Sequence, residues 1–212
     1  MTLRQPPIFR MYRLGIDATD RARFTAEGQH NLLTSHQTEP GTLAMLATHA
    51  DAAGTDNFIF EVYRDAAAYD VHAKSPQFKR YGQVAQQVLT QRAMTELNPK
   101  LLISPKRELR LTDDPVPTAV LLQATVTGDP TTWMARQPLG LTDGAMLRYV
   151  ATTTDQAQRV VILSLYPDRR AAQKALTAWQ GRLNVNTTNF AARLLTVDTM
   201  VCHADVNFET TV

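Results

Sequence analysis

The stretch Asn57–Tyr81, NFIFEVYRDAAAYDVHAKSPQFKRY, decides the fold. Strand formers come first, and Glu61 is the single charge set among them. Asp65 can then cap a helix that begins with three alanines, which are strong helix formers that leave room for close packing. Ser75-Pro76 interrupts that helix, because proline disfavours the α conformation in the residue before it. The stretch therefore predicts a strand and then a short helix that carries His72, after which the chain restarts.

The order of residues in this stretch resembles the hallmark segment of the antibiotic biosynthesis monooxygenase (ABM) domain family. Family members usually read Glu-x-Tyr/Trp-x-Asp-x-x-Ala-x-x-x-His-x-x-Ser-Pro-x-Phe, and this chain has the matching residues in register at Glu61, Tyr63, Asp65, Ala68, His72, Ser75, Pro76 and Phe78. Upstream, Glu39-Pro40-Gly41 is the tripeptide that commonly precedes the second strand of the family. The resemblance implies a ferredoxin-like fold. It says less about chemistry, since such domains host several unrelated activities.

Composition excludes several classes of protein. The net charge of +2 is small and the basic residues are scattered, which disfavours a nucleic-acid partner. The single cysteine, Cys202, cannot form an internal disulfide and fits a reducing cytoplasm, where we expect it to be a small buried side chain. The chain shows neither a signal peptide nor an apolar run approaching about 18 residues, so secretion and membrane spanning are not indicated. A nucleotide cofactor is not supported either, because glycine-rich phosphate-binding motifs are missing from the sequence.

Local patterns predict one complete unit in the first half of the chain. Before the quoted stretch they indicate a strand over Ile8–Ile16, a helix over Arg21–Thr38 and a strand over Thr42–Thr48. After it they indicate a continuing helix over Gln83–Leu97 and a closing strand over Leu101–Ile103. We expect Asn98-Pro99 to end the last helix. The result is a βαββαβ order, which is the ferredoxin-like one.

The second half repeats this pattern at a constant offset. Tyr166 follows Tyr63 by 103 residues, and the same offset places Gly144 on Gly41. We expect strands near 118–126 and 198–207 and a helix near 130–139. The fold class predicted is therefore α+β, with two tandem ferredoxin-like units at residues 1–108 and 109–212 and a boundary in the segment 106–117.

The ABM resemblance implies how the two units pack. In single-domain relatives the antiparallel sheets of two chains pack face to face, so a tandem chain can build the same dimeric α/β barrel internally, as a pseudo-dimer. A further homodimer stays open. When the two halves are aligned at the offset of 103 residues, Glu61 aligns with Ser164 and His72 aligns with Ala175. The second unit thus lacks both polar residues, and the first unit is favoured as the active one. We expect an apolar pocket there that the second unit helps to wall.

Glu61 and His72 are the candidate catalytic residues. Glu61 shares one face of its strand with Ile59 and Tyr63, and burial of that face would raise the pKa of the carboxyl and suit it to proton exchange. A structural Glu hydrogen-bonded within its own unit is the alternative. His72 can take a proton or bind a metal or haem iron, or it can simply pin its helix to the sheet.

Further residues are candidates for binding a substrate. They are Tyr12, Phe24, His30, Asn31, Tyr63 and Phe78, although aromatic side chains of this kind are more often core residues than ligand contacts. His30 and His36 are six residues apart and so point to different faces of a helix, which argues against a paired metal site. We expect no metal ligands from the sequence.

The resemblance implies a function as well. ABM enzymes of one type are cofactor-independent monooxygenases that act on electron-rich aromatics such as quinols and anthrones, with a base that would here be His72 or Glu61. A haem-degrading branch is the enzymatic alternative, although its members typically have an Asn on the first strand and a Trp, where this chain has no such Asn and has Tyr63. A module that binds a small hydrophobic ligand or supports assembly, without turnover, is the third interpretation.

Overall fold

The computed structural model describes residues 1–112, 117–183 and 187–210, and every structural statement below concerns these residues. The first half of the chain contains β1 (Ile8–Ile16), a 3-10 turn η1 (Ala18–Asp20), α1 (Arg21–Thr38), β2 (Thr42–His49), β3 (Asp56–Tyr63), α2 (Ala66–Lys74), α3 (Pro76–Val88) and β4 (Leu89–Ile103). The second half contains β5 (Leu109–Leu111), β6 (Thr118–Val126), α4 (Pro130–Ala135), β7 (Leu147–Thr153), β8 (Arg159–Tyr166), α5 (Arg169–Leu183), β9 (Thr187–Cys202) and β10 (Asn207–Glu209).

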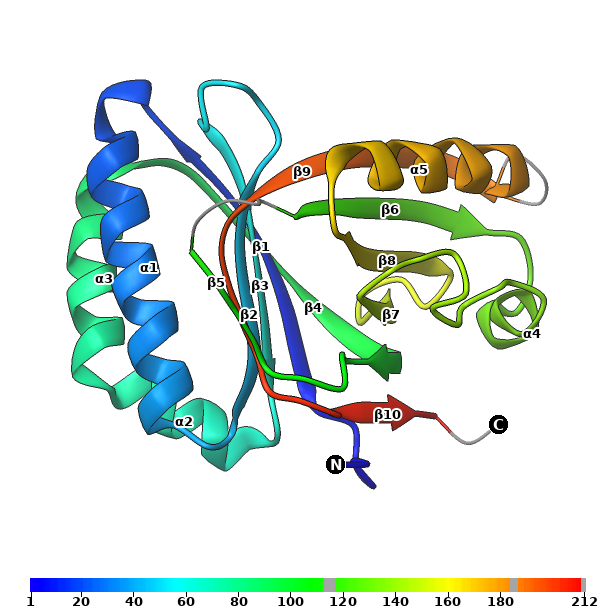
Figure 1. Cartoon of the computed structure of the whole chain (residues 1–212), viewed down its shortest axis with the longest axis horizontal. Coiled ribbons are helices and arrows are strands. Elements are labelled where there is room, and N and C mark those ends of the chain that lie inside the picture. Colours follow the sequence, from blue (N-terminus) through cyan, green and yellow to red (C-terminus); the bar gives the residue numbers. More distant parts are fainter. Residues whose placement is uncertain (113–116, 184–186, 211–212) are drawn as a thin grey trace.

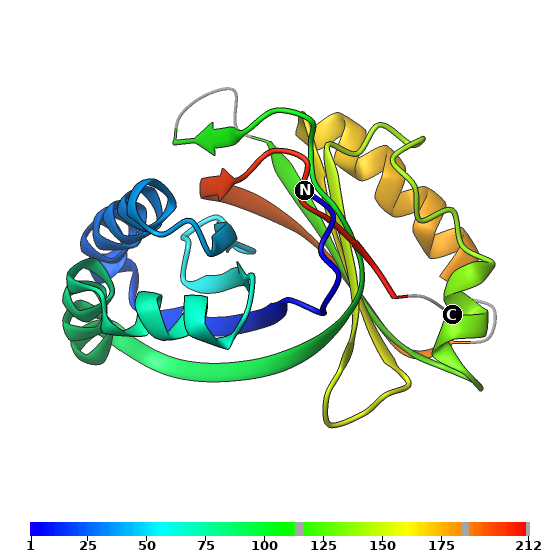
Figure 2. The same cartoon turned by 90° about the horizontal axis from the view of Figure 1, so that it is seen from below.

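The strands form a closed antiparallel barrel. Its order is β1-β3-β2-β9-β6-β8-β7-β4, and β4 returns to pair with β1. The short strands β5 and β10 are additions that pair with β9 and β4. The helices lie on the outside, with α1 and α3 against one side of the barrel and α5 against the other (Figures 1 and 2). The predicted fold class, two ferredoxin-like units packed as an internal α/β barrel, is thereby confirmed.

Two long strands join the halves. The first part of β4 pairs with β1 and its last part, from Leu97 to Ile103, pairs with β7. In the same way β9 pairs with β6 up to Thr196 and with β2 from there to Cys202. Each of these strands therefore belongs to both sheets, and the barrel cannot close without them.

The sequence prediction was wrong about both long strands. Residues 89–97 belong to β4 rather than to a helix that continues to Leu97, because pairing with β1 overrides their local helical pattern. Pro99 lies inside β4, at a point where the pairing with β7 shifts register. The last long strand runs from Thr187 to Cys202, and the chain pairs again only at β10. Of the predicted boundary segment, residues 113–116 lie outside the described part of the chain, and the division at residue 108 stays a prediction.

The alternation of side chains along β3 separates the barrel core from the helix-facing layer. Phe58, Phe60 and Val62 point into the barrel and pack with side chains from both halves. Ile59 points the other way, into a cluster with residues of α1 and α3. Glu61 lies two residues after Ile59 in the same strand, so its side chain also lies on the helix-facing side.

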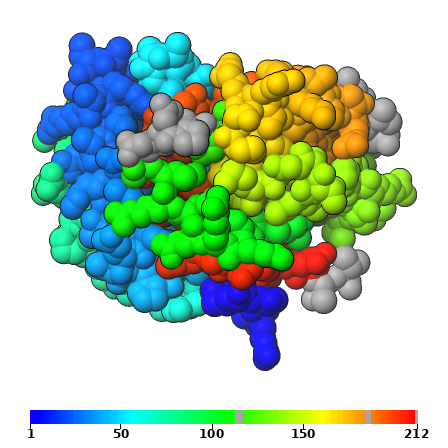
Figure 3. Space-filling model, viewed as in Figure 1, coloured from blue at the N-terminus to red at the C-terminus, as the bar shows by residue number. Residues whose placement is uncertain are grey.

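The connection after β4 lies across the front of the molecule (Figure 3), between α1 and the second half of the chain. Within the described residues, none of the helices is both long and apolar enough to cross a membrane.

The predicted break between α2 and α3 is confirmed. Asp65 caps α2, since its carboxylate accepts from the backbone N–H of Ala68 at 2.8 Å. Ser75 caps α3, with Pro76 in the first helical turn. At the start of α2, Ala68 lies so close to Gly41 that a Cβ on the glycine would collide with the alanine methyl group. Gly41 therefore allows α2 to pack against the beginning of β2.

We expect Gly41→Ala to destabilise the protein by about 1–3 kcal/mol, the usual cost of overpacking a closely fitted contact. Urea unfolding measures the change. Gly181→Ala is the matched control, because Gly181 lies in α5 with open space where a Cβ would be, and alanine there should stabilise by about 0.5–1 kcal/mol. Equal effects of the two substitutions would contradict the packing of α2 on β2.

Candidate active site

A cavity of about 530 Å³ lies on the helix-facing side of β1 and β3, beneath α2 and α3. Its lining is mainly aromatic and aliphatic, and consists of Tyr12, Leu14, Ile59, Glu61, Tyr69, Phe78, Tyr81, Gly82, Ala85, Gln86, Leu89 and Arg92. All of these residues belong to the first half of the chain. The expectation that the second unit helps to wall the pocket therefore does not hold for this cavity, because the second unit closes the barrel on the opposite face of β3. Asp198 and Thr199 of the second unit do line a much smaller cavity that Glu61 also borders.

Glu61 is the carboxylate at the wall of this cavity. Its side chain projects from β3, the residue is 7% exposed, and its Oε2 accepts a hydrogen bond from the hydroxyl of Tyr63 at 2.9 Å. Burial raises the pKa of Glu61, although His72, Tyr63 and Arg10 act in the opposite direction. Glu61 also borders a second, very small cavity of about 20 Å³ between α1 and the sheet. The site thus offers one desolvated carboxyl group to a ligand.

His72 lies behind the cavity wall rather than at it. The residue is fully buried on α2, and its ring packs between Tyr63 and Phe78, at centroid distances of 5.3 and 4.8 Å. Its Nδ1 lies 3.0 Å from Oε2 of Glu39 and 3.2 Å from Oγ of Ser35. Nε2 has no hydrogen-bond partner among the described residues. His72 therefore holds Phe78 and Tyr63 in place, and does not itself face the cavity.

Glu39 anchors His72. Besides its contact with His72, the carboxylate of Glu39 accepts hydrogen bonds from the hydroxyl of Thr42 at 2.7 Å and from the side-chain amide of Gln77 at 2.6 Å. Burial works to raise the pKa of Glu39, but the hydrogen bonds from His72 and Thr42 outweigh it and the pKa is lowered. The sequence analysis noticed Glu39 only as part of a motif, since nothing in the spacing connects residues 33 positions apart.

The other predicted binding residues fall into three groups. Tyr12 and Phe78 line the large cavity. Phe24 and Asn31 line only the small cavity under α1. His30 is exposed on α1 and Tyr63 is fully buried, and neither lines either of these two cavities, so their assignment as binding residues finds no support.

Two tyrosines and an arginine that were not predicted from the sequence complete the lining of the large cavity. Tyr69 and Tyr81 face the cavity from α2 and α3, and Arg92 reaches it from β4. Burial and the nearby carboxyl of Glu61 raise the pKa of Tyr12 to about 12, so that phenol stays protonated and can donate a hydrogen bond. Arg92 was missed because its segment was predicted to be helical.

A comparison with known families matches the first part of the chain. Residues 7–84 match the sequence model of the family described as antibiotic biosynthesis monooxygenase. The resemblance found in the sequence is thus confirmed for this segment, which carries Glu39, Glu61, His72 and most of the cavity lining. No functionally curated protein matches the chain.

Solved structures extend the likeness to the second half of the chain. A putative monooxygenase from Lactobacillus acidophilus is 20% identical with a TM-score of 0.77, covering 96% of this chain and 99% of that one. A putative monooxygenase from Fusobacterium nucleatum is 15% identical with a TM-score of 0.85, covering 99% and 100%. An anthrone oxidase-like protein is 13% identical with a TM-score of 0.57, covering 93% of each chain. At these identities the likeness shows the fold.

The buried carboxyl of Glu61 predicts a pH dependence of stability. The pKa of Glu61 in the folded state is raised above the ordinary 4.5. The contribution of Glu61 to the stability of the fold is therefore fully present below pH 4.5 and is lost as the pH rises through the folded-state pKa. Wild type should therefore lose stability relative to Glu61→Gln as the pH rises above 4.5. Urea unfolding of both proteins at a series of pH values measures the difference.

Glu39→Gln provides a control of opposite sign. Because the pKa of Glu39 is lowered in the folded state, the contribution of Glu39 to stability is present above pH 4.5 and is lost as the pH falls. The advantage of wild type over Glu39→Gln should therefore shrink in acid. If wild type and Glu61→Gln differed by the same amount at every pH, Glu61 would not be a desolvated acid.

Proposed function

We propose that the cavity of the first half binds a small electron-rich aromatic molecule, of the hydroquinone or anthrone type, and that the protein catalyses its monooxygenation without a cofactor. The observation that carries this proposal is the desolvated carboxyl of Glu61 at the wall of an aromatic-lined cavity of about 530 Å³. Most of the residues that line that cavity lie in the segment that matches the ABM family. The substrate class follows the family resemblance and the description of one structural neighbour as anthrone oxidase-like.

Glu61 is the general base in this proposal. A carboxylate whose pKa is raised by burial is a stronger base than one in water, and it is suited to remove a proton from a phenol or from the acidic CH₂ group of an anthrone. Tyr63 donates to Oε2 and fixes the orientation of the carboxylate. Arg92, at the cavity edge, supplies positive charge near the anion that forms.

The substrate anion then reduces dioxygen. For an anthrone, the ring CH₂ becomes C=O: its carbon gains one oxygen atom, and its two hydrogens leave with the second oxygen atom as water. The substrate supplies all the electrons, so the reaction needs no external reductant. The protein contributes the base, the orientation of the ring and a pocket of low polarity in which the anion is poorly solvated and reactive.

His72 acts as a positioning residue. It does not line the cavity, but its ring supports Phe78, which does, and Tyr63, which orients Glu61. This placement also argues against haem binding, since His72 was the axial ligand considered in the sequence analysis and it does not face the cavity.

Oxygen uptake with hydroquinone and anthrone tests the proposal. Glu61→Gln should lower kcat by about 100-fold or more, the contribution typical of a general base. Asp70→Asn is the matched control, because Asp70 is an exposed carboxylate on α2 whose ion pair with Lys74 is in solvent. His72→Ala should change KM and kcat together and move the pH at which the rate rises upward, since that pH reports on Glu61 and His72 acts to lower the pKa of that carboxyl.

Two results would contradict the proposal. One is a wild-type protein that consumes no oxygen with either substrate class. The other is a Glu61→Gln variant as fast as wild type. Tight binding of these aromatics without oxygen uptake would instead favour the non-catalytic ligand-binding module.

A further inference from the structure

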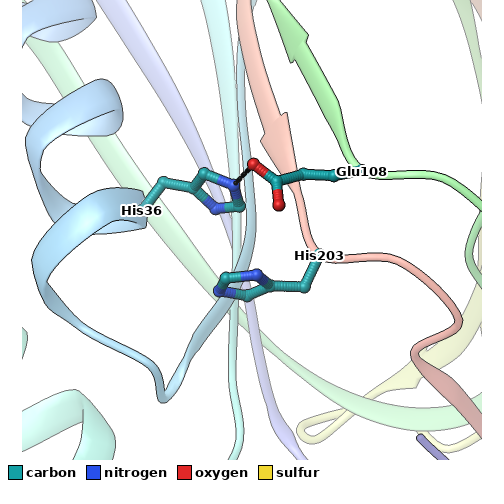
Figure 4. A group of neighbouring side chains, drawn as sticks. All are labelled: His36, Glu108 and His203. Carbon is teal, nitrogen blue, oxygen red and sulfur yellow. Dashed lines mark hydrogen bonds and ion pairs between the residues drawn. The ribbon is translucent and has the colours of Figure 1, made fainter.

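We propose that His36, Glu108 and His203 form a binding site for a divalent transition-metal ion such as Zn²⁺. Figure 4 shows the three side chains gathered together, with the two imidazole rings one above the other and the carboxylate beside them. One ligand atom from each residue lies within 4.8 Å of the others. None of the three residues lines the cavity that contains Glu61, so this is a separate site.

The donor set is one that zinc prefers. Two imidazole nitrogens and one carboxylate oxygen, with bonds of about 2.0–2.2 Å, make up a common three-residue zinc site with a fourth position open to water. Nε2 of His36 now lies 2.8 Å from Oε1 of Glu108, and the ring centroids of His36 and His203 are 4.2 Å apart. The carboxylate of Glu108 is 57% exposed and His203 is partly exposed, so small rotations of these two side chains can bring all three donors onto one ion.

Unpartnered nitrogen atoms point to a missing ligand. Nδ1 of His36 and Nε2 of His203 are buried and lack a hydrogen-bond partner among the described residues, and His36 as a whole is 6% exposed. Buried polar atoms are nearly always satisfied in folded proteins.

The three residues come from distant parts of the chain. His36 lies in the last turn of α1, Glu108 in the connection between β4 and β5, and His203 directly after β9. A bound ion would tie a helix of the first half to the end of a strand that both halves share. Arg110, two residues after Glu108, is a cationic neighbour that the ion must tolerate. We therefore expect the ion to stabilise the fold.

Titration of the chelator-treated full-length protein with Zn²⁺ by calorimetry tests the site. Wild type should bind one ion per chain, and the ion should raise the melting temperature because it binds the folded state. His203→Ala and Glu108→Gln should each weaken binding by about tenfold or more, since loss of even an outer-sphere partner typically costs about 10–100-fold. Glu108 is exposed, so Glu108→Gln should fold normally, and circular dichroism checks this.

His30→Ala is the matched control, because it removes an exposed imidazole from the same helix and should leave zinc binding unchanged. Co²⁺ provides a second readout, through the visible absorption that it gains when imidazole and carboxylate ligands replace water. Wild type that binds no stoichiometric Zn²⁺ would overturn the proposal. So would His203→Ala and Glu108→Gln variants that bind as tightly as wild type.

Discussion

The structure depends on two strands that belong to both halves of the chain. β4 pairs with β1 and then with β7, and β9 pairs with β6 and then with β2, so the two sheets close into one barrel. Closure buries one face of β3, with Phe60 and Val62, in a core built from both halves. The opposite face, with Glu61, is thereby left to meet the helices. The second half thus determines the orientation of the site without contributing to the wall of its large cavity.

The site contains two buried glutamates whose environments push their pKa values apart. Glu39 accepts hydrogen bonds from three side chains, and its pKa is lowered. Glu61 accepts one, from Tyr63, and desolvation raises its pKa. Such a divergence separates a structural carboxylate from one available for proton transfer. His72 lies between the two, since it is hydrogen-bonded to Glu39 and packs on Tyr63, which in turn contacts Glu61. Glu39 thus supports the geometry around Glu61.

Local signals in the sequence predicted the parts of the fold that local chemistry controls. The strand at Glu61, the cap at Asp65 and the break at Ser75-Pro76 are each decided within a few residues, and all three are correct. Residues 89–97 were assigned to the wrong class because their conformation is decided by pairing with β1, about 80 positions away. The contacts of His72 with Glu39 and of His36 with His203 leave no periodic signal, since they form only when the whole chain has folded. The sequence could therefore identify Glu61 and His72, but not which of them reaches the cavity.

The central claim is that Glu61 is a desolvated carboxyl group at the wall of a cavity. Carbon-13 NMR of the glutamate side-chain carboxyls, with Glu61 assigned by comparison with Glu61→Gln, follows its protonation directly. The account predicts a titration midpoint above the ordinary 4.5, which shifts when an aromatic ligand fills the cavity. A midpoint at or below 4.5 that no ligand alters would show that this carboxyl is solvated, and would contradict the claim.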